Sequence, residues 1–213
     1  MTDPLIDKLV NDLTPRDPLV NKTVWIHCSL CLFILTGVIV GFLGFRFDAQ
    51  SAFLNGTIFW KSGMFLAGWI GSLLLMTDIS RPGGRIKPWH TLLVGLTFGI
   101  LIWQIVSQLT GAPLSAQMTE LRDASALYCL SIITGAGAVV LFLTWRIWLS
   151  KAASGNPVML GGLAGFGAGC LTAAAYSLHC TMDASLYICA YYFLPIFLLS
   201  AASALFASKF LRW

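Results

Sequence analysis

Residues 158–178 read VMLGGLAGFGAGCLTAAAYSL and contain no charged side chain. An α-helix needs about 20 apolar residues to cross the hydrocarbon core of a bilayer, and a helix satisfies its own backbone hydrogen bonds there. Small residues recur in this run at every fourth position: Gly161, Gly165, Gly169, Ala173 and Ser177. Because such a stripe lets a neighbouring backbone approach closely, we expect this helix to be central in a bundle or to pair with a second copy in a homodimer.

Five further stretches have the same length and apolar character: 24–45, 57–76, 90–109, 125–148 and 185–207. The composition agrees, because 57% of the 213 residues are hydrophobic and only 10% are charged, whereas a soluble domain carries roughly 25% charged residues. The sequence therefore predicts an all-α membrane protein, in which residues 24–207 form a bundle of six transmembrane helices with short loops. A leader (1–23) and a tail (208–213) flank the bundle, and neither is long enough for a soluble catalytic domain.

The basic residues are divided unequally between the two sides that this topology defines. The side that holds the leader and the tail contains most of them: Lys8, Arg16, Lys22, Arg81, Arg85, Lys87, Arg146, Lys151, Lys209 and Arg212. The other side contains Arg46, Lys61 and Arg122. Because cytoplasmic loops carry the excess of Lys and Arg, we expect both termini in the cytoplasm. Lys61 and Arg146 lie near helix ends, from where long side chains can reach the interface.

The interiors of the spans contain few groups that could bind or relay an ion. Transporters and channels usually place ionisable side chains inside the bilayer, but the middle of every predicted span lacks Asp, Glu, Lys, Arg and His. Gln104 and Gln108 are the most polar side chains there, and a hydrogen bond between helices is the simpler explanation for them. A small transporter or permease subunit remains the alternative function, and it predicts a water-filled cavity at these two glutamines.

Three of the six cysteines lie in predicted spans away from the outer end: Cys28 and Cys31 near the inner boundary of the first span, and Cys170 in the middle of the fifth. Cys28 and Cys31 form a C-x-x-C, but the redox motif of this spacing is expected at a strand-to-helix junction of a soluble fold. Packing as small apolar residues is therefore the favoured interpretation, and Cys170 is interpreted in the same way. A membrane redox enzyme that uses the C-x-x-C is a third and disfavoured class.

Cys129 and Cys180 lie at similar depth on the outer side, at the start of the fourth span and after the end of the fifth. They could approach closely enough to form a disulfide, or to share a soft metal ion with His179 as a third ligand. Cys189, about one turn into the sixth span, competes as a partner for Cys180. The spacing alone leaves open whether these thiols are functional or incidental.

The leader contains the pattern of a short amphipathic helix. Thr2 or Asp3 can cap a helix with Pro4 at its first position. Its apolar face consists of Leu5, Ile6, Leu9, Val10 and Leu13. Two interpretations remain open: a helix packed against the cytoplasmic loops, and a helix that binds in a groove of a soluble partner.

Several short motifs match those of one membrane family. They are the leader Leu5–Pro15, Gly44-x-Arg46-x-Asp48 after the first span, Arg81-Pro-Gly83 after the second, Tyr176-Ser-Leu-His-Cys180 with Asp183 after the fifth, and the tail Phe210-Leu-Arg-Trp213. On these residues the chain resembles the NrsF-type integral membrane anti-sigma factors, negative regulators of extracytoplasmic-function sigma factors of the sigma-F kind. It departs from the family at Thr181-Met182, where Pro-Glu is frequent, and at Tyr191-Tyr192, where many members have Trp-Tyr.

The resemblance implies a binding and signalling protein of the bacterial inner membrane. It implies no enzymatic activity, no cofactor and no direct contact with nucleic acid. The protein would hold an extracytoplasmic-function sigma factor at the cytoplasmic face and release it under metal or oxidative stress. The family's two outer cysteines correspond to Cys129 and Cys180 as sensory thiols, and no metal site is assigned. The leader, with its apolar face Leu5, Ile6, Leu9, Val10 and Leu13, would form part of the sigma-binding surface.

Overall fold

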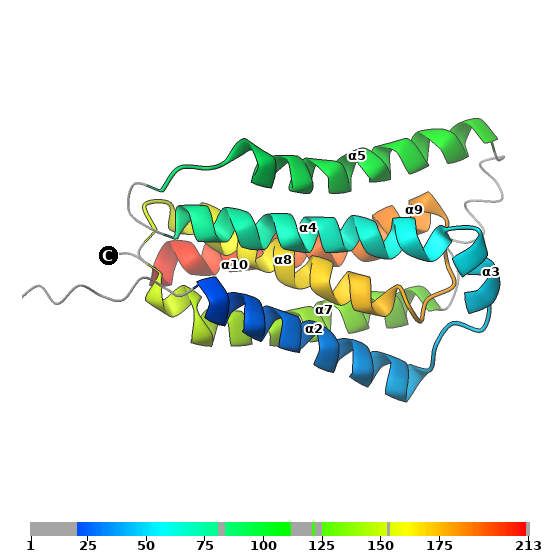
Figure 1. The fold of residues 1–213 in the computed structure, drawn as a ribbon, viewed down its shortest axis with the longest axis horizontal. Coiled ribbons are helices and arrows are strands. Elements are labelled where there is room, and N and C mark those ends of the chain that lie inside the picture. The colour runs from blue at the N-terminus through cyan, green and yellow to red at the C-terminus, as the bar shows by residue number, and fades with distance from the viewer. Residues whose placement is uncertain (1–20, 81–83, 112–120, 122–124, 153, 212–213) are drawn as a thin grey trace, which may run out of the picture.

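The computed structural model describes residues 21–80, 84–111, 121, 125–152 and 154–211 (Figure 1). The predicted apolar face of the leader, Leu5, Ile6, Leu9, Val10 and Leu13, lies outside the described residues. We call the two ends of the bundle the α3 end and the terminal end. The α3 end is on the right in Figure 1, and the terminal end, where α2 begins and α10 finishes, is on the left.

Every regular element of the described residues is a helix, and six helices are long and apolar enough to cross a membrane. Five are single elements: α2 (Asn21–Leu43), α4 (Thr57–Ile79), α5 (Pro88–Gly111), α7 (Ser125–Ile147) and α8 (Pro157–Tyr176). The sixth is continuous but has three parts: α9 (Ser185–Ile188), the π-helix η2 (Cys189–Phe193) and α10 (Leu194–Phe210). The prediction of an all-α bundle with six spanning helices is confirmed.

The structure also contains two short helices that the sequence analysis did not predict, α3 (Ala49–Leu54) and the 3₁₀ helix η1 (Leu149–Lys151). The first span ends at Leu43 rather than at Phe45, because Gly44 has a φ of +83° that ends the helix. The chain then turns sharply and forms α3 across the end of the bundle. This turn brings the residues after the first span over the end of α8.

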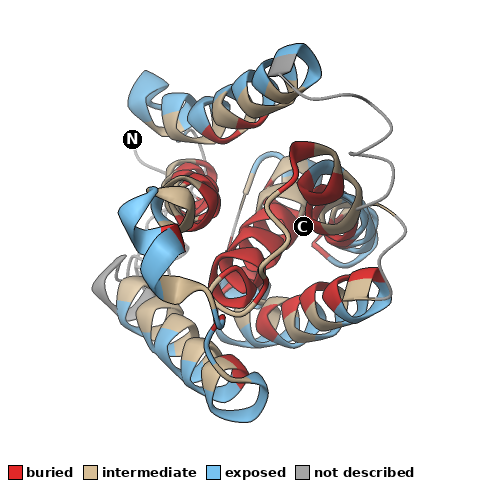
Figure 2. Ribbon diagram, turned by 90° about the vertical axis from the view of Figure 1, so that its right-hand side faces the viewer, coloured by how far each residue is buried: buried red, intermediate tan, exposed pale blue. Residues whose placement is uncertain are grey.

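Helix α8 lies at the centre of the bundle. In its spanning segment 78% of the residues are buried, against 6% in α2 and 11% in α5. Figure 2 shows buried residues gathered at the centre and exposed residues facing outwards. The exposed side chains include large apolar ones, such as Phe42, Trp103 and Phe142, which is the arrangement expected where a helix faces lipid.

The small-residue stripe of α8 is covered by α10. A Cβ atom added to Gly161 would lie 2.6 Å from the carbonyl oxygen of Ser203, and one added to Gly169 would lie 3.0 Å from the Cα atom of Ile196. The last member, Ser177, shares a 2.5 Å hydrogen bond with Ser62 of α4. Of the two expectations for the stripe, the structure therefore favours a central position within one chain over pairing with a second copy.

Candidate functional site

A buried ion cluster at the α3 end begins with Arg46, which follows the first span. The backbone N–H of Arg46 donates to the Leu178 carbonyl at 3.2 Å, so the residue is held against the end of α8. Its guanidinium donates two hydrogen bonds of 2.7 Å to the carboxylate of Asp48. The side chain of Arg46 is only 1% exposed. The Gly-x-Arg-x-Asp motif thus forms a local bidentate ion pair at the point where α2 ends.

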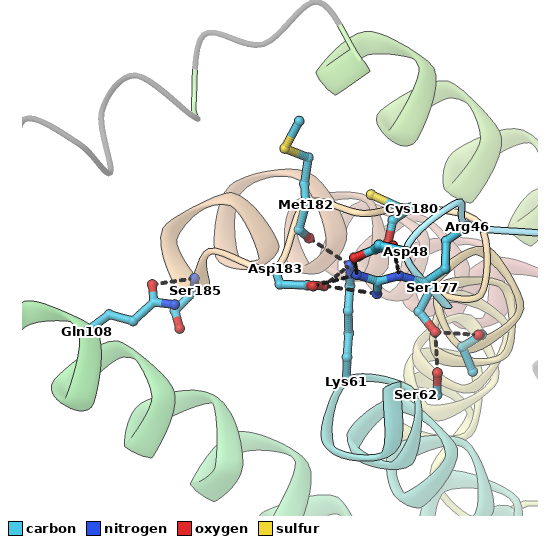
Figure 3. Close-up of polar contacts among 11 residues, drawn as sticks. Arg46, Asp48, Lys61, Ser62, Gln108, Ser177, Cys180, Met182, Asp183 and Ser185 are labelled. Carbon is cyan, nitrogen blue, oxygen red and sulfur yellow. Dashed lines mark hydrogen bonds and ion pairs between the residues drawn. The ribbon is translucent and has the colours of Figure 1, made fainter. Parts of the chain in front are cut away.

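Asp183, in the loop between α8 and α9, joins this pair to α4 (Figure 3). One of its oxygens accepts from the Arg46 guanidinium at 2.8 Å, and the other accepts from the Lys61 ammonium at 3.1 Å. Lys61 also donates to the carbonyls of Met182 at 2.6 Å and Cys180 at 3.3 Å. All three ammonium hydrogens therefore have acceptors. We call Arg46, Asp48, Lys61 and Asp183 the ion cluster.

Lys61 does not extend into solvent. Its side chain is 0% exposed and points into the ion cluster, and the ammonium also lies 5.0 Å from the ring centroid of Tyr192. The physical reason is that two carbonyls and a carboxylate of the α8–α9 loop are within its reach. A buried ammonium with three acceptors and a counter-charge avoids the cost of an unpaired buried charge.

The ion cluster contains two cations and two carboxylates, and it is neutral when all four are ionised. Hydrogen bonds from Arg46 lower the pKa of Asp48 below its usual value. Hydrogen bonds to Asp48, followed by those to Asp183, raise the pKa of Arg46 although burial opposes this. Because the folded-state pKa of Asp48 is lowered, its contribution to stability is complete above the usual Asp pKa. That contribution is lost as the pH falls through the lowered value.

The two predicted sensory thiols lie beside the ion cluster. Cys129 in α7 is 0% exposed and Cys180 after α8 is 6% exposed, and both are unpaired thiols. Cys129 interacts electrostatically with Cys180 and with Lys61. The Lys61 ammonium also donates a hydrogen bond to the Cys180 carbonyl. The buried Tyr192 side chain interacts with both thiols. The structure thus brings both predicted thiols into one polar region at the α3 end.

A cleft of about 320 Å³ opens next to this region, and it connects the surface to Cys180. Its walls come from the chain after α2 and from the α8–α9 loop. They include Arg46, Phe47, Tyr176, His179, Cys180 and Thr181. Cys180 is therefore the thiol that a small reagent from the α3 end would meet, whereas the cleft is not lined by Cys129.

His179 binds the turn after the first span. Its Nδ1 atom lies 3.0 Å from the Gly44 carbonyl oxygen, which ties the end of α8 to the turn after α2. Within the described part of the chain, no three His, Cys, Asp or Glu side chains form a group that could hold a metal ion. Cys189 is exposed, whereas Cys129 and Cys180 are buried in the apolar core. His179 and Cys180 line the same cleft, but among the described residues they do not form a three-ligand group with Cys129 or Cys189.

The remaining polar side chains that the sequence analysis considered serve packing. The side-chain carbonyl of Gln108 in α5 accepts a 2.7 Å hydrogen bond from the backbone N–H of Ser185, at the start of α9. The interpretation of Gln108 as an interhelical hydrogen-bonding residue is thereby confirmed. Cys28 and Cys31 are partly buried and pack against the apolar core, as expected for small apolar residues.

The fold and the site together define a class: a small bundle of membrane-length helices whose buried charges tie helix ends together. The comparisons with known proteins give the family. A family model described as NrsF, negative regulator of sigma F, matches residues 9–213, and the chain belongs to this family. The family description implies a regulatory protein whose partner is a sigma factor. Neither a curated protein nor a solved structure gave a significant match.

Proposed function

We propose that this protein is an anti-sigma factor of the bacterial inner membrane, without enzymatic activity, that sequesters an extracytoplasmic-function sigma factor and releases it under stress. The family match over residues 9–213 carries the proposal. In this arrangement the terminal end faces the cytoplasm and the α3 end faces the periplasm, as the excess of Lys and Arg near the terminal end favours. The six membrane-length helices are compatible with that location.

The surface that holds the sigma factor would combine the leader with the terminal end of the bundle. Beside the loop between α4 and α5 the structure has a polar cleft of about 350 Å³, lined in part by Asp78, Arg85, Lys87 and His90. Within it, Asp78 accepts from the Lys87 backbone at 3.1 Å and lies 2.5 Å from the His90 ring. These polar groups and the apolar leader face offer a partner two kinds of contact.

We expect the full-length protein to capture a sigma factor from a cytoplasmic extract and a chain lacking residues 1–22 to lose that capture by at least tenfold. The reason is that the apolar leader face is then absent, while α2, which begins at Asn21, loses only its first two residues. Quantitative mass spectrometry of the captured proteins measures the effect. A second variant with Leu5→Asp and Leu9→Asp keeps the length of the chain and serves as the control for truncation. Equal capture by all three proteins would contradict the role of the leader.

The stress signal would enter at the α3 end through Cys129 and Cys180. The burial of both thiols and the cleft that reaches Cys180 support this proposal. Oxidation would join the two sulfurs, release two protons and pass two electrons to an oxidant of the periplasm. A soft metal ion would instead replace the thiol protons, since thiolates are the ligands that such ions prefer. Either reaction would tie α7 to the end of α8.

We expect the double variant Cys129→Ser/Cys180→Ser to keep its sigma factor when cells are exposed to a soft metal ion or a thiol oxidant. The wild type would release it under the same conditions, because only the wild type can form the sulfur bonds. The measurement is co-purification of the sigma factor before and after exposure. Cys28→Ser/Cys31→Ser is the matched control and should respond like the wild type. Release from the Cys129/Cys180 variant would show that these thiols do not sense the stress.

A further inference from the structure

A narrow apolar groove lies in the terminal half of the bundle and is lined by residues of α2, α4, α7 and α8. Its volume is about 40 Å³, which holds about three groups of the size of a water molecule. Leu143 and Ile147 line the groove and are 39% and 37% exposed, so it opens on the outer surface of the bundle. Its described lining residues include no Asp, Glu, Lys or Arg. The groove is therefore an uncharged slot that faces the surroundings of the helices.

The groove extends from the terminal boundary of the spans to the middle of the bilayer. Along α7 its lining runs from Val140 to Trp148, which directly follows the helix, and this distance is about 12 Å. On α8 its innermost lining residue is Leu171, about 21 Å from the start of that helix. Because the hydrocarbon core is about 30 Å thick, the groove lies at a depth where acyl chains surround the bundle.

Trp148, at the terminal mouth of the groove, contains a hydrogen-bond donor without an acceptor. The residue is 4% exposed, and its indole N–H is buried with no hydrogen-bond partner among the described residues. Buried tryptophans usually have a partner for this N–H, and a buried donor without one is unfavourable. An occupant that brings an oxygen atom to Trp148 would supply the missing acceptor.

We propose that the groove binds one acyl chain of a diacyl phospholipid and that the ester carbonyl of this chain accepts a hydrogen bond from the Trp148 indole N–H. The ester is joined directly to the acyl chain, so a chain that fills the groove places its ester at the boundary where Trp148 lies. Tryptophan is enriched at this level of a membrane because its ring is apolar and its N–H is polar. The bound chain also gives α2, whose spanning segment is only 6% buried, a further surface on which to pack.

The chemistry of the groove favours an ester lipid over other occupants. A free fatty acid would bring a carboxylate, and burying an unpaired charge is costly where no Lys or Arg is among the described lining residues. A lipid phosphate placed in the groove would need the same cation. A folded protein partner cannot enter a slot of about 40 Å³. A neutral oxygen at the end of an apolar chain satisfies both the walls and Trp148.

The first test uses the full-length protein in vesicles of dioleoylphosphatidylcholine that contain a phosphatidylcholine with a photoreactive diazirine midway along one acyl chain. Irradiation and peptide mass spectrometry then locate the label. Ala164, Ala168 and Leu171 of α8 line the groove and are buried, so a lipid chain reaches them only by entering the groove. We expect labelling within residues 164–171 of the wild type, and no label there would overturn the inference.

Two substitutions on opposite walls make the labelling test specific. Thr144→Phe fills the groove from α7 and Cys31→Phe fills it from α2, since both residues line it. Each should reduce labelling of residues 164–171 at least fivefold. Val139→Phe is the matched control, because Val139 is 60% exposed and is not a lining residue, and it should be labelled like the wild type. Unchanged labelling in both groove variants would overturn the inference.

The acceptor is tested on the wild type by NMR of the indole N–H groups in nanodiscs of two lipids. One is dioleoylphosphatidylcholine, and the other has the same chains in ether linkage and so lacks the ester carbonyl. Trp148→Phe identifies the Trp148 signal. We expect the proton signal of Trp148 to move upfield in the ether lipid, because the hydrogen bond is lost. The signal of Trp103, which is 71% exposed on α5, should stay in place.

A Trp148 signal at the same position in both lipids would show that the ester carbonyl is not its acceptor and would overturn the inference. None of these measurements uses a sigma factor. The lipid site and the proposed function can therefore fail independently of each other.

Discussion

Asp183→Asn is expected to lower the free energy of unfolding by about 3 kcal/mol, because it leaves Arg46 and Lys61 with a single counter-charge. Removing one partner from a buried ion pair typically costs about 3–5 kcal/mol of unfolding free energy. We expect a loss at the lower end of this range because the Asp183 side chain is 27% exposed. The asparagine has the same shape, so the effect isolates the charge. The measurement is the unfolding transition in mixed detergent micelles, followed by circular dichroism.

Two comparisons make this prediction specific. Lys87→Gln removes an exposed charge at the terminal end and should change stability by less than about 0.5 kcal/mol. Lys61→Met/Asp183→Asn restores neutrality, since Arg46 and Asp48 still pair. The loss of unfolding free energy in this double variant should be smaller than the summed losses of Lys61→Met and Asp183→Asn. The difference should exceed about 1 kcal/mol, as expected for residues in contact. An Asp183→Asn protein as stable as Lys87→Gln would show that the ion cluster contributes little.

The ion cluster also shows which parts of the structure the sequence could predict. Helix positions follow from local apolar runs, and the central place of α8 follows from a stripe within one helix. The partner of Lys61 lies 122 residues away, so a reading of one helix at a time could not identify it. The available signal was the location of Arg46 and Lys61 on the side that is otherwise poor in basic residues. Two buried cations there require acidic partners, and Asp48 and Asp183 are close to the ends of neighbouring spans.

The thiol region was predicted in part. The sequence placed Cys129 and Cys180 on one side at similar depth, and in the structure both are buried in the same apolar cluster. It could not show that His179 binds the turn after α2, because that contact depends on the sharp turn at Gly44. The 3.6 Å hydrogen bond from the Cys129 thiol to the Tyr191 carbonyl falls in a π-helical turn, which has no reliable sequence signature.

Gly165→Ala is expected to destabilise the bundle by about 2–3 kcal/mol, at the upper end of the cost of overpacking a core. The added Cβ would meet the Leu199 carbonyl oxygen and lie 2.7 Å from the Cα atom of Ser200. These are backbone atoms of α10, so the contact cannot be relieved by a side-chain rotation, and the two helices must separate.

Gly162→Ala is the matched control, because the same substitution three residues earlier meets no backbone atom. Its Cβ would lie 3.7 Å from the side chains of Ala204 and Ser200, which is ordinary contact. Alanine is favoured over glycine in a helix by up to about 1 kcal/mol, so this variant should be as stable as the wild type or more stable. Unfolding in mixed micelles measures both variants side by side. The close approach of α8 and α10 requires opposite effects from the two substitutions, and equal stability of the two proteins would contradict it.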